Sequence, residues 1–117
     1  MTLRVVQLGV FVGVIVAVAT AQRDFSDVEI KPTRVAGKVY MLEGSGGNIG
    51  ISLGDDGVLM IDDQYAPLAE KIQSVISKLG GGKPKFVLNT HWHGDHTGGN
   101  EHFGRDGTII AHEMVRQ

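Results

Sequence analysis

The fold of this chain is decided by one stretch of sequence, which reads Thr90-His91-Trp92-His93-Gly94-Asp95-His96-Thr97-Gly98-Gly99-Asn100. It holds three histidines and one aspartate within six residues, although the whole chain of 117 residues has only five histidines. Imidazole and carboxylate groups together suit zinc, iron and manganese. The alternative is a surface loop with incidental histidines, and clustering this tight argues against it. The stretch predicts a metal site.

The spacing of the four candidate ligands indicates more than one metal ion. On an extended backbone His91, His93 and Asp95 would share one face, while His96 would point elsewhere. On a helical backbone His93 and His96 would lie one turn apart instead. No single regular element directs all four side chains at one ion, so two neighbouring metals are the simpler interpretation. Such ions would lie roughly 3.5–4 Å apart and would share this loop.

The segments on either side of this stretch predict alternating strands and helices. Apolar residues at helical spacing predict a helix over 67–79. Short apolar strands are expected at 86–88 and 108–111, and a second helix is expected from His112 onward. The histidine-rich stretch follows the first of these strands directly. Loops after strand ends are where α/β folds place their sites, so the position agrees with the chemistry.

The upstream part of the chain predicts an antiparallel hairpin. Residues 48–53 alternate apolar with polar or small side chains, which is the pattern of a half-buried strand. Asp55-Asp56-Gly57 is a hairpin-turn sequence, and 58–61 is a short apolar strand after it. A further strand, broken by a glycine, is expected over 35–42. A hairpin followed by alternating helices and strands predicts an α/β fold.

The histidine-rich stretch resembles the signature of the metallo-β-lactamase superfamily. The resemblance rests on His91-x-His93-x-Asp95-His96, preceded by Asn89-Thr90 and followed by Thr97-Gly98-Gly99. The superfamily includes metallo-β-lactamases, glyoxalase II-type thioesterases, lactonases and related hydrolases. The resemblance implies the N-terminal half of an αββα sandwich over about residues 35–117.

The resemblance also implies a role for each residue of the signature. His91 and His93 would bind a first zinc ion, and Asp95 and His96 would bind a second. Asp95 would be catalytic as well, because it would orient the attacking water and accept its proton. Asp62, directly after a predicted strand, would support the metal site without being a main ligand.

Downstream of the signature the sequence departs from the family pattern. Family members add a third histidine to the first zinc, then a bridging acidic residue, then a last histidine to the second zinc. The histidines after His96 are His102 and His112, expected on a short helix and at a helix start, and both lie too close to the signature to be those ligands. The chain is therefore expected to hold the N-terminal portion of such a domain.

Composition and charge exclude other classes of protein. Eleven Lys and Arg against thirteen Asp and Glu give a net charge of −2, so no nucleic-acid partner is expected. The chain has no cysteine, which excludes disulfides, thiolate metal sites and a cysteine nucleophile. Hydrophobic residues make up 42% of the chain, as in ordinary globular proteins, which argues against disorder.

The first 21 residues predict a secretory signal peptide. They combine one charge at Arg4, a continuous apolar run and the small residues Ala19-Thr20-Ala21, which suit a signal peptidase. An uncleaved membrane anchor is the alternative, because the run approaches the length that spans a bilayer. Cleavage after Ala21 would leave a polar leader arm over 22–34. It would send the protein to the periplasm or the medium, without membrane attachment.

Together these features predict an exported zinc-dependent hydrolase. A metal-bound hydroxide would attack the ester, thioester, lactone or β-lactam carbonyl of a small-molecule substrate. The alternatives are an iron- or manganese-dependent member of the same fold, and an inactive chain that only binds metal. Trp92 is expected either to line the substrate pocket or to pack in the interior. Asp63 is expected to be a solvated carboxylate in a turn, with a supporting role behind the metal ligands as the alternative.

Overall fold

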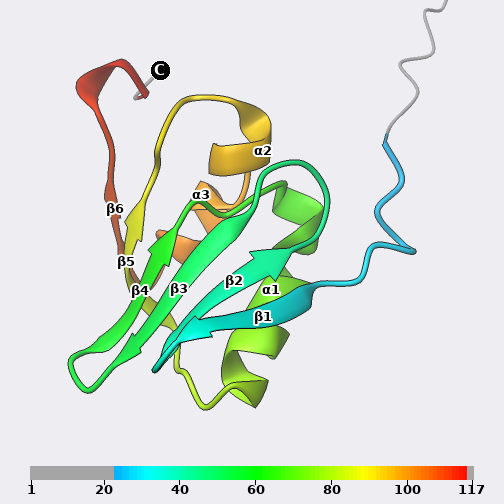
Figure 1. The fold of residues 1–117 in the computed structure, drawn as a ribbon. Helices are drawn as coiled ribbons and strands as arrows, with labels where there is room; N and C mark the ends of the chain where they lie inside the picture. The colour runs from blue at the N-terminus through cyan, green and yellow to red at the C-terminus, as the bar shows by residue number, and fades with distance from the viewer. Residues whose placement is uncertain (1–22, 116–117) are drawn as a thin grey trace, which may run out of the picture.

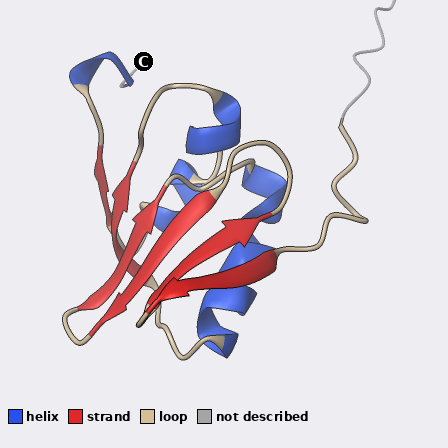
Figure 2. Cartoon of the chain, in the orientation of Figure 1, coloured by secondary structure: helices blue, strands red, loops and turns tan. Residues whose placement is uncertain are grey.

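The computed structural model describes residues 23–115, which form one six-stranded mixed sheet with helices against one face (Figures 1 and 2). The strands follow one another across the sheet in chain order, from β1 to β6. The first four strands pair antiparallel, whereas β4 pairs with β5, and β5 with β6, in parallel. The predicted α/β fold class is confirmed. The predicted signal peptide, residues 1–21, lies outside the described residues.

The antiparallel half consists of two hairpins. Its strands are β1 (Lys31–Ala36), β2 (Val39–Glu43), β3 (Ile49–Gly54) and β4 (Gly57–Ile61). The predicted hairpin at Asp55-Asp56-Gly57 is confirmed, since Leu53 pairs with Val58 and Gly54 with Gly57. Gly57 has φ +122°, a backbone conformation that favours glycine at this turn.

Two boundaries differ from those expected in this half. The polar arm expected over 22–34 ends earlier, because Lys31–Arg34 belongs to β1 and pairs with β2. The single strand expected over 35–42 is in fact the end of β1 and most of β2, with the chain turning between them at Gly37 (φ +49°). All six residues of β1 are exposed at the sheet edge, so no alternation of apolar side chains marks this strand in the sequence.

The parallel half contains the helices and the connection to the site. Its elements are η1 (Ala66–Leu68), α1 (Ala69–Lys78), β5 (Pro84–Leu88), α2 (Gly94–Thr97), α3 (Asn100–Phe103), β6 (Thr108–Ile110) and η2 (Glu113–Val115). The predicted helix over 67–79 is confirmed, with a 3-10 first turn. Where a second helix was expected from His112, the described residues show only the 3-10 turn η2.

The hydrophobic core lies between the sheet and α1. Val58 and Met60 of β4 point to the same face as Val87 of β5, and Ile72 and Ile76 of α1 cover them. The alternation along each strand sends every second side chain to this core. The core therefore fixes the direction in which β4 and β5 deliver the residues that follow them.

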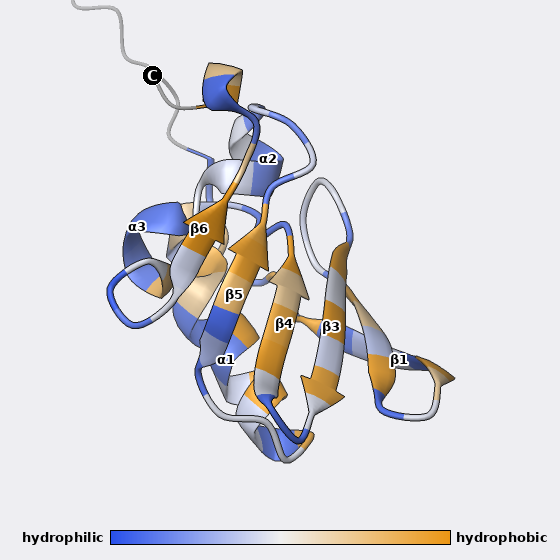
Figure 3. Cartoon of the chain, turned by 90° about the vertical axis from the view of Figure 1, so that its left-hand side faces the viewer, coloured by the Kyte–Doolittle hydropathy of each residue, from blue (hydrophilic) through white to orange (hydrophobic). Residues whose placement is uncertain are grey.

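The opposite face of the sheet is apolar and has no covering layer in the described part of the chain. Ile61, Phe86, Leu88 and Ile110 are each 36–46% exposed on it, and the register pairs Ile61 with Leu88 and Leu88 with Ile110. Figure 3 shows the apolar character running across β4, β5 and β6. An uncovered apolar face is what one layer of a sandwich presents. Within residues 23–115, no helix has the length and apolar character needed to cross a membrane.

Candidate metal centre

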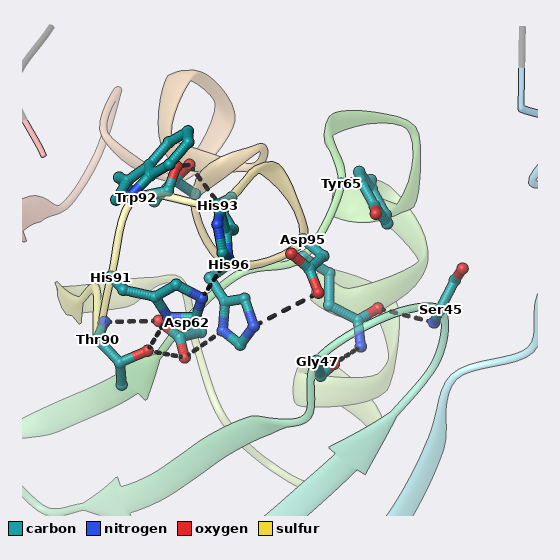
Figure 4. A network of polar contacts seen from close by, with 12 residues as sticks. Ser45, Gly47, Asp62, Tyr65, Thr90, His91, Trp92, His93, Asp95 and His96 are labelled. Atoms are coloured by element: carbon teal, nitrogen blue, oxygen red, sulfur yellow. Dashed lines mark hydrogen bonds and ion pairs between the residues drawn. The ribbon is translucent and has the colours of Figure 1, made fainter.

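The candidate ligands lie at the carboxyl ends of the two neighbouring parallel strands β4 and β5. Asp62 follows β4, and its backbone N–H donates to the carbonyl of Leu88 at the end of β5 (2.8 Å). The histidine-rich loop leaves β5 through Asn89 and returns over Asp62 in the short helix α2 (Figure 4). Two adjacent strand ends thus bring together residues that are about thirty positions apart in the sequence.

Asp62 is the anchor of this site. It is buried, and its φ of +60° is a left-handed conformation that non-glycine residues rarely adopt. Its carboxylate accepts hydrogen bonds from the backbone N–H of Thr90, from the hydroxyl of Thr90 and from Nδ1 of His96, each at 2.8 Å. Asp62 is therefore in contact with both flanks of the histidine-rich loop.

The hydrogen bonds of Thr90 assign the proton on the His91 ring. A carboxylate only accepts, so the single hydroxyl proton of Thr90 goes to Asp62. The hydroxyl oxygen must then accept from Nδ1–H of His91, 3.0 Å away. This assignment leaves a lone pair on Nε2 of His91, the nitrogen that faces the other ligands. Thr90 therefore contacts both Asp62 and His91, a contact that its place in the motif did not predict.

The first pair of candidate ligands is His91 and His93. Nε2 of His91 lies 3.0 Å from Nδ1 of His93, and the two rings meet edge to face. His93 is exposed, and Trp92 between them is 65% exposed, so the indole is not packed in the interior. The interpretation of Trp92 as an interior packing residue is therefore wrong.

The second pair is Asp95 and His96. Nδ1 of His96 donates to Asp62, and Nε2 of the same ring faces Oδ2 of Asp95 at 3.4 Å. In the neutral ring, Nε2 carries a lone pair, so two electron-pair donors face each other. A cation between them, either a proton or a metal ion, is needed to make that contact favourable.

The two separations suit a divalent metal. Two ligand atoms on one tetrahedral zinc, each about 2.0–2.1 Å from it, stand about 3.3 Å apart. The nitrogens of the first pair, 3.0 Å apart, and the nitrogen and oxygen of the second, 3.4 Å apart, are close to that value. Among residues 23–115, however, no three such side chains converge as a ready ligand set. The structure brings the four predicted ligands together as two pairs.

The expectation that Asp63 is a solvated carboxylate is wrong. Its side chain is fully buried beneath the histidine-rich loop, where Oδ1 accepts the backbone N–H of Gly99 (2.8 Å) and Oδ2 has no hydrogen-bond partner among residues 23–115. Burial is the main reason that the pKa of Asp63 rises to about 7, and the neighbouring Asp62 carboxylate raises it further. Its backbone N–H donates to the carbonyl of His96 (3.1 Å). The residue therefore ties the loop to the end of β4.

Asn89 secures the same loop from the β5 side. Its side-chain N–H₂ donates to the carbonyl of His96 (3.1 Å), and its side-chain oxygen accepts from Asn100 (2.8 Å). The other two histidines lie away from the site, as expected. His102 on α3 packs against Phe103, and Nδ1 of His112 accepts the N–H of Met114.

Comparison with known proteins agrees with this geometry. The family model of the metallo-beta-lactamase superfamily matches residues 39–114. The chain belongs to this superfamily. A search of curated proteins gave no significant match. The family membership confirms the resemblance inferred from the signature.

Solved metallo-beta-lactamase structures share the fold. One is a B3 metallo-beta-lactamase described as the first with an active-site glutamic acid, at 32% identity and a TM-score of 0.66; the match covers 72% of this chain and 33% of that one. Another is BJP-1, a subclass B3 enzyme of Bradyrhizobium japonicum, at 26% identity and a TM-score of 0.65, covering 73% and 34%.

A third structure shows the same fold at lower identity. FIM-1 from Pseudomonas aeruginosa, in a mono-zinc form, has 18% identity and a TM-score of 0.67, covering 76% of this chain and 44% of that one. The matches to the first two structures span about a third of their length. This chain therefore contains one part of the metallo-beta-lactamase fold.

Proposed function

We propose that this protein is an exported zinc-dependent hydrolase that acts on a carbonyl substrate, namely an ester, thioester, lactone or β-lactam. The observation that carries the proposal is which ring nitrogens of His91 and His96 are hydrogen-bonded to supporting residues. Asp62 and Thr90 occupy the outer nitrogens of His96 and His91, so the inner nitrogens are directed toward Asp95 and His93. Carboxylate partners that fix the tautomer in this way are typical of zinc-binding histidines.

In this proposal His91 and His93 hold one ion, and Asp95 and His96 hold the other. Bound zinc lowers the pKa of water to about 7, which supplies a nucleophile at neutral pH. Asp95 is partly exposed, and it uses one oxygen toward His96 while the other can orient a water molecule and accept its proton. Asp62 and Thr90 hold the two rings in place, and the exposed Trp92 offers a surface beside the site for the substrate.

The proposal is tested first by metal content. The protein is purified, and bound zinc, iron and manganese are measured by elemental mass spectrometry in the wild type and in His93→Ala. The matched control is His102→Ala, a histidine outside the site. Zinc content that is equal in the wild type and the control, and lower in His93→Ala because the first pair is lost while the second remains, supports the proposal. Iron or manganese in place of zinc, or an unchanged zinc content in His93→Ala, contradicts it.

Activity is tested on the same proteins. Hydrolysis of a lactone, a thioester and a chromogenic β-lactam is measured before and after chelation, and after zinc is restored. Activity that disappears with the chelator and returns with zinc is expected for at least one substrate. Because histidine binds metal only in its neutral form, zinc retention should also fall below about pH 5–6. Zinc retention unchanged at pH 4 contradicts this ligand set.

Export is part of the same proposal and rests on residues 1–21, which lie outside the described residues. The native host is fractionated, and the N-terminus of the exported protein is sequenced. A mature chain beginning at Gln22 is expected. A product found in the cytoplasm or the membrane with Met1 in place contradicts export by cleavage.

A further inference from the structure

The loop that joins β2 to β3 lies against the second ligand pair. β2 and β4 run in the same direction because each is antiparallel to β3, so the end of β2 lies at the same edge of the sheet as Asp62. Figure 4 shows Gly47 of this loop near Asp95 and His96, with Ser45 farther from them. We call residues 44–47, Gly-Ser-Gly-Gly, the glycine loop.

The contact between the glycine loop and the ligands leaves no space for side chains on the loop. A Cβ atom on Gly46 would lie 2.6 Å from Cβ of Asp95, and a Cβ atom on Gly47 would lie 2.6 Å from Nε2 of His96. Both distances are shorter than real Cβ contacts allow. The backbone of the glycine loop therefore packs directly against the carboxylate and the imidazole of the second pair.

Gln64 holds the glycine loop in this position. Its side chain is fully buried, and its Oε1 accepts the backbone N–H of Ser45 (3.2 Å) while its Nε2 donates to the carbonyl of Gly47. One amide thus binds the loop at two points, as donor and as acceptor. Its own carbonyl accepts the N–H of Gly99 (3.1 Å), at the end of the histidine-rich loop. Gln64 is therefore bonded to both loops that enclose the second pair.

The backbone around Gln64 is adapted to this arrangement. Asp62 and Gln64 have φ of +60° and +56°, while extended chain would alternate its side chains between opposite faces. With these two left-handed residues, Asp62, Asp63 and Gln64 are all buried, and each binds a different part of the site. Left-handed conformations are unfavourable at non-glycine residues and persist where the surroundings hold them.

We propose that Gln64 is a positioning residue that holds the glycine loop against Asp95 and His96 and so fixes the orientation of the second metal-binding pair. The proposal deepens the proposed function and rests on it, since the pair is assigned there to a metal. The side-chain hydrogen bonds of Gln64 go to the backbone of the loop, so Gln64 acts on the ligands through that backbone. Loss of the two hydrogen bonds from the Gln64 side chain would release the glycine loop from the second pair. The His96 ring and the Asp95 carboxylate could then reorient.

The experiment compares Gln64→Leu with Gln73→Leu in the metal-free protein. Gln73 is the matched control, because it is a partly exposed glutamine on α1 whose side chain bonds to Ser77 and Gly82 and not to the glycine loop. Amide hydrogen exchange is measured at Ser45, and the ring nitrogens of His96 are followed by NMR. In Gln64→Leu, exchange at Ser45 should rise at least tenfold and the His96 ring signals should shift. Amides of β3 and β4 should keep their protection, and Gln73→Leu should match the wild type.

A second variant decides the matter if Gln64→Leu does not fold. Gly47→Ala places a methyl group against His96 while Gln64 still holds the loop, so the ring should be displaced and its NMR signals should shift. His96 signals unchanged in Gly47→Ala, or unchanged in a folded Gln64→Leu, would overturn the proposal. Protection lost equally across the sheet in Gln64→Leu would also overturn it, because that result marks a general structural role.

Metal binding separates this proposal from the proposed function. Gln64→Leu should bind zinc at the second pair about tenfold more weakly, as is typical when a group that orients ligands is lost. If the wild type binds no zinc, the proposed function fails, while the metal-free NMR and exchange results still decide the role of Gln64. If the wild type binds zinc and Gln64→Leu binds it equally well, the proposal about Gln64 fails alone.

Discussion

The two candidate ligand pairs are adjacent in sequence but differ in how firmly the fold holds them. Asp95 and His96 lie in the short helix α2, beneath the glycine loop, and His96 is bonded to the buried Asp62. His91 and His93 lie in the loop before α2, where Thr90 supports one ring and the other is exposed. Contacts from several elements hold the second pair. The first pair has one hydrogen bond from a supporting side chain, that of Thr90 to His91, and its rings pack against His96 and Trp92.

The largest expected effect comes from removing the residue that the two pairs share. Asp62→Ala takes a buried, charged acceptor away from the backbone N–H and hydroxyl of Thr90 and from the partly buried His96 ring. We expect a loss of about 3–5 kcal/mol in the free energy of unfolding, because bonds to charged groups are worth about 1.5–3 kcal/mol each. Zinc affinity should fall at both pairs.

Urea denaturation and zinc titration measure these two losses. Asp55→Ala is the control, because Asp55 is an exposed aspartate of the β3–β4 turn that pairs with the exposed Lys38. It should leave both measurements at their wild-type values. An Asp62→Ala protein that keeps wild-type stability would show that the two pairs have no common anchor.

The next effect concerns Asp63, buried under the histidine-rich loop, and the dependence of the free energy of unfolding on pH. The pKa of buried Asp63, about 7, lies above the unfolded value of about 3.9, so the folded chain holds the extra proton between these values. The contribution of Asp63 to the free energy of unfolding is therefore largest below about pH 4. It falls by up to about 4 kcal/mol as the pH rises to about 7. Asp63→Asn keeps an oxygen for Gly99 but does not titrate.

The contribution of Asp63 is measured as a difference between two proteins. The free energy of unfolding of metal-free wild type and Asp63→Asn is determined by urea denaturation between pH 4.5 and 7.5. The stability of the wild type relative to the variant should fall as the pH rises. A constant difference between the two proteins would mean that Asp63 is ionised throughout this range.

A smaller effect is expected on the first pair alone. Thr90→Val keeps the shape of the side chain but removes the hydroxyl that fixes the His91 tautomer. We expect a loss of about 1–2 kcal/mol in stability. Zinc affinity should fall about tenfold at His91 and His93, with less change at Asp95 and His96. Equal losses at the two pairs, measured by zinc titration, would contradict the separate support inferred here.

The smallest effect is expected at Trp92, which separates the two histidines of the first pair. Because the indole is 65% exposed, Trp92→Ala should change the free energy of unfolding by less than about 0.5 kcal/mol. Zinc binding should also be unchanged, because the ring has no bond to a ligand nitrogen. A clear loss of stability in thermal or urea denaturation would mean that the ring is packed after all.

Elements with a strong local signal were predicted closely, and exposed or long-range features were not. The helix over 67–79 and the hairpin at Asp55-Asp56-Gly57 were predicted because periodicity and turn residues mark them. The strand β1 was missed, since an exposed edge strand has no alternation. Asp62 came from the family resemblance, whereas Asp63 was misjudged because a carboxylate after a strand is usually solvated.

The sequence by itself determined the superfamily, the four candidate ligands and the alternation of strands and helices. Their residue types and spacings are local properties of the chain, and so they can be recognised without coordinates. Only the tertiary structure showed that Gln64 binds the glycine loop and that Thr90 determines which ring nitrogen of His91 carries the proton. It also showed that the candidate ligands form two unequally supported pairs. These contacts join segments that neighbouring strand ends bring together, and their geometry depends on left-handed backbone at Asp62 and Gln64 that no local pattern predicts.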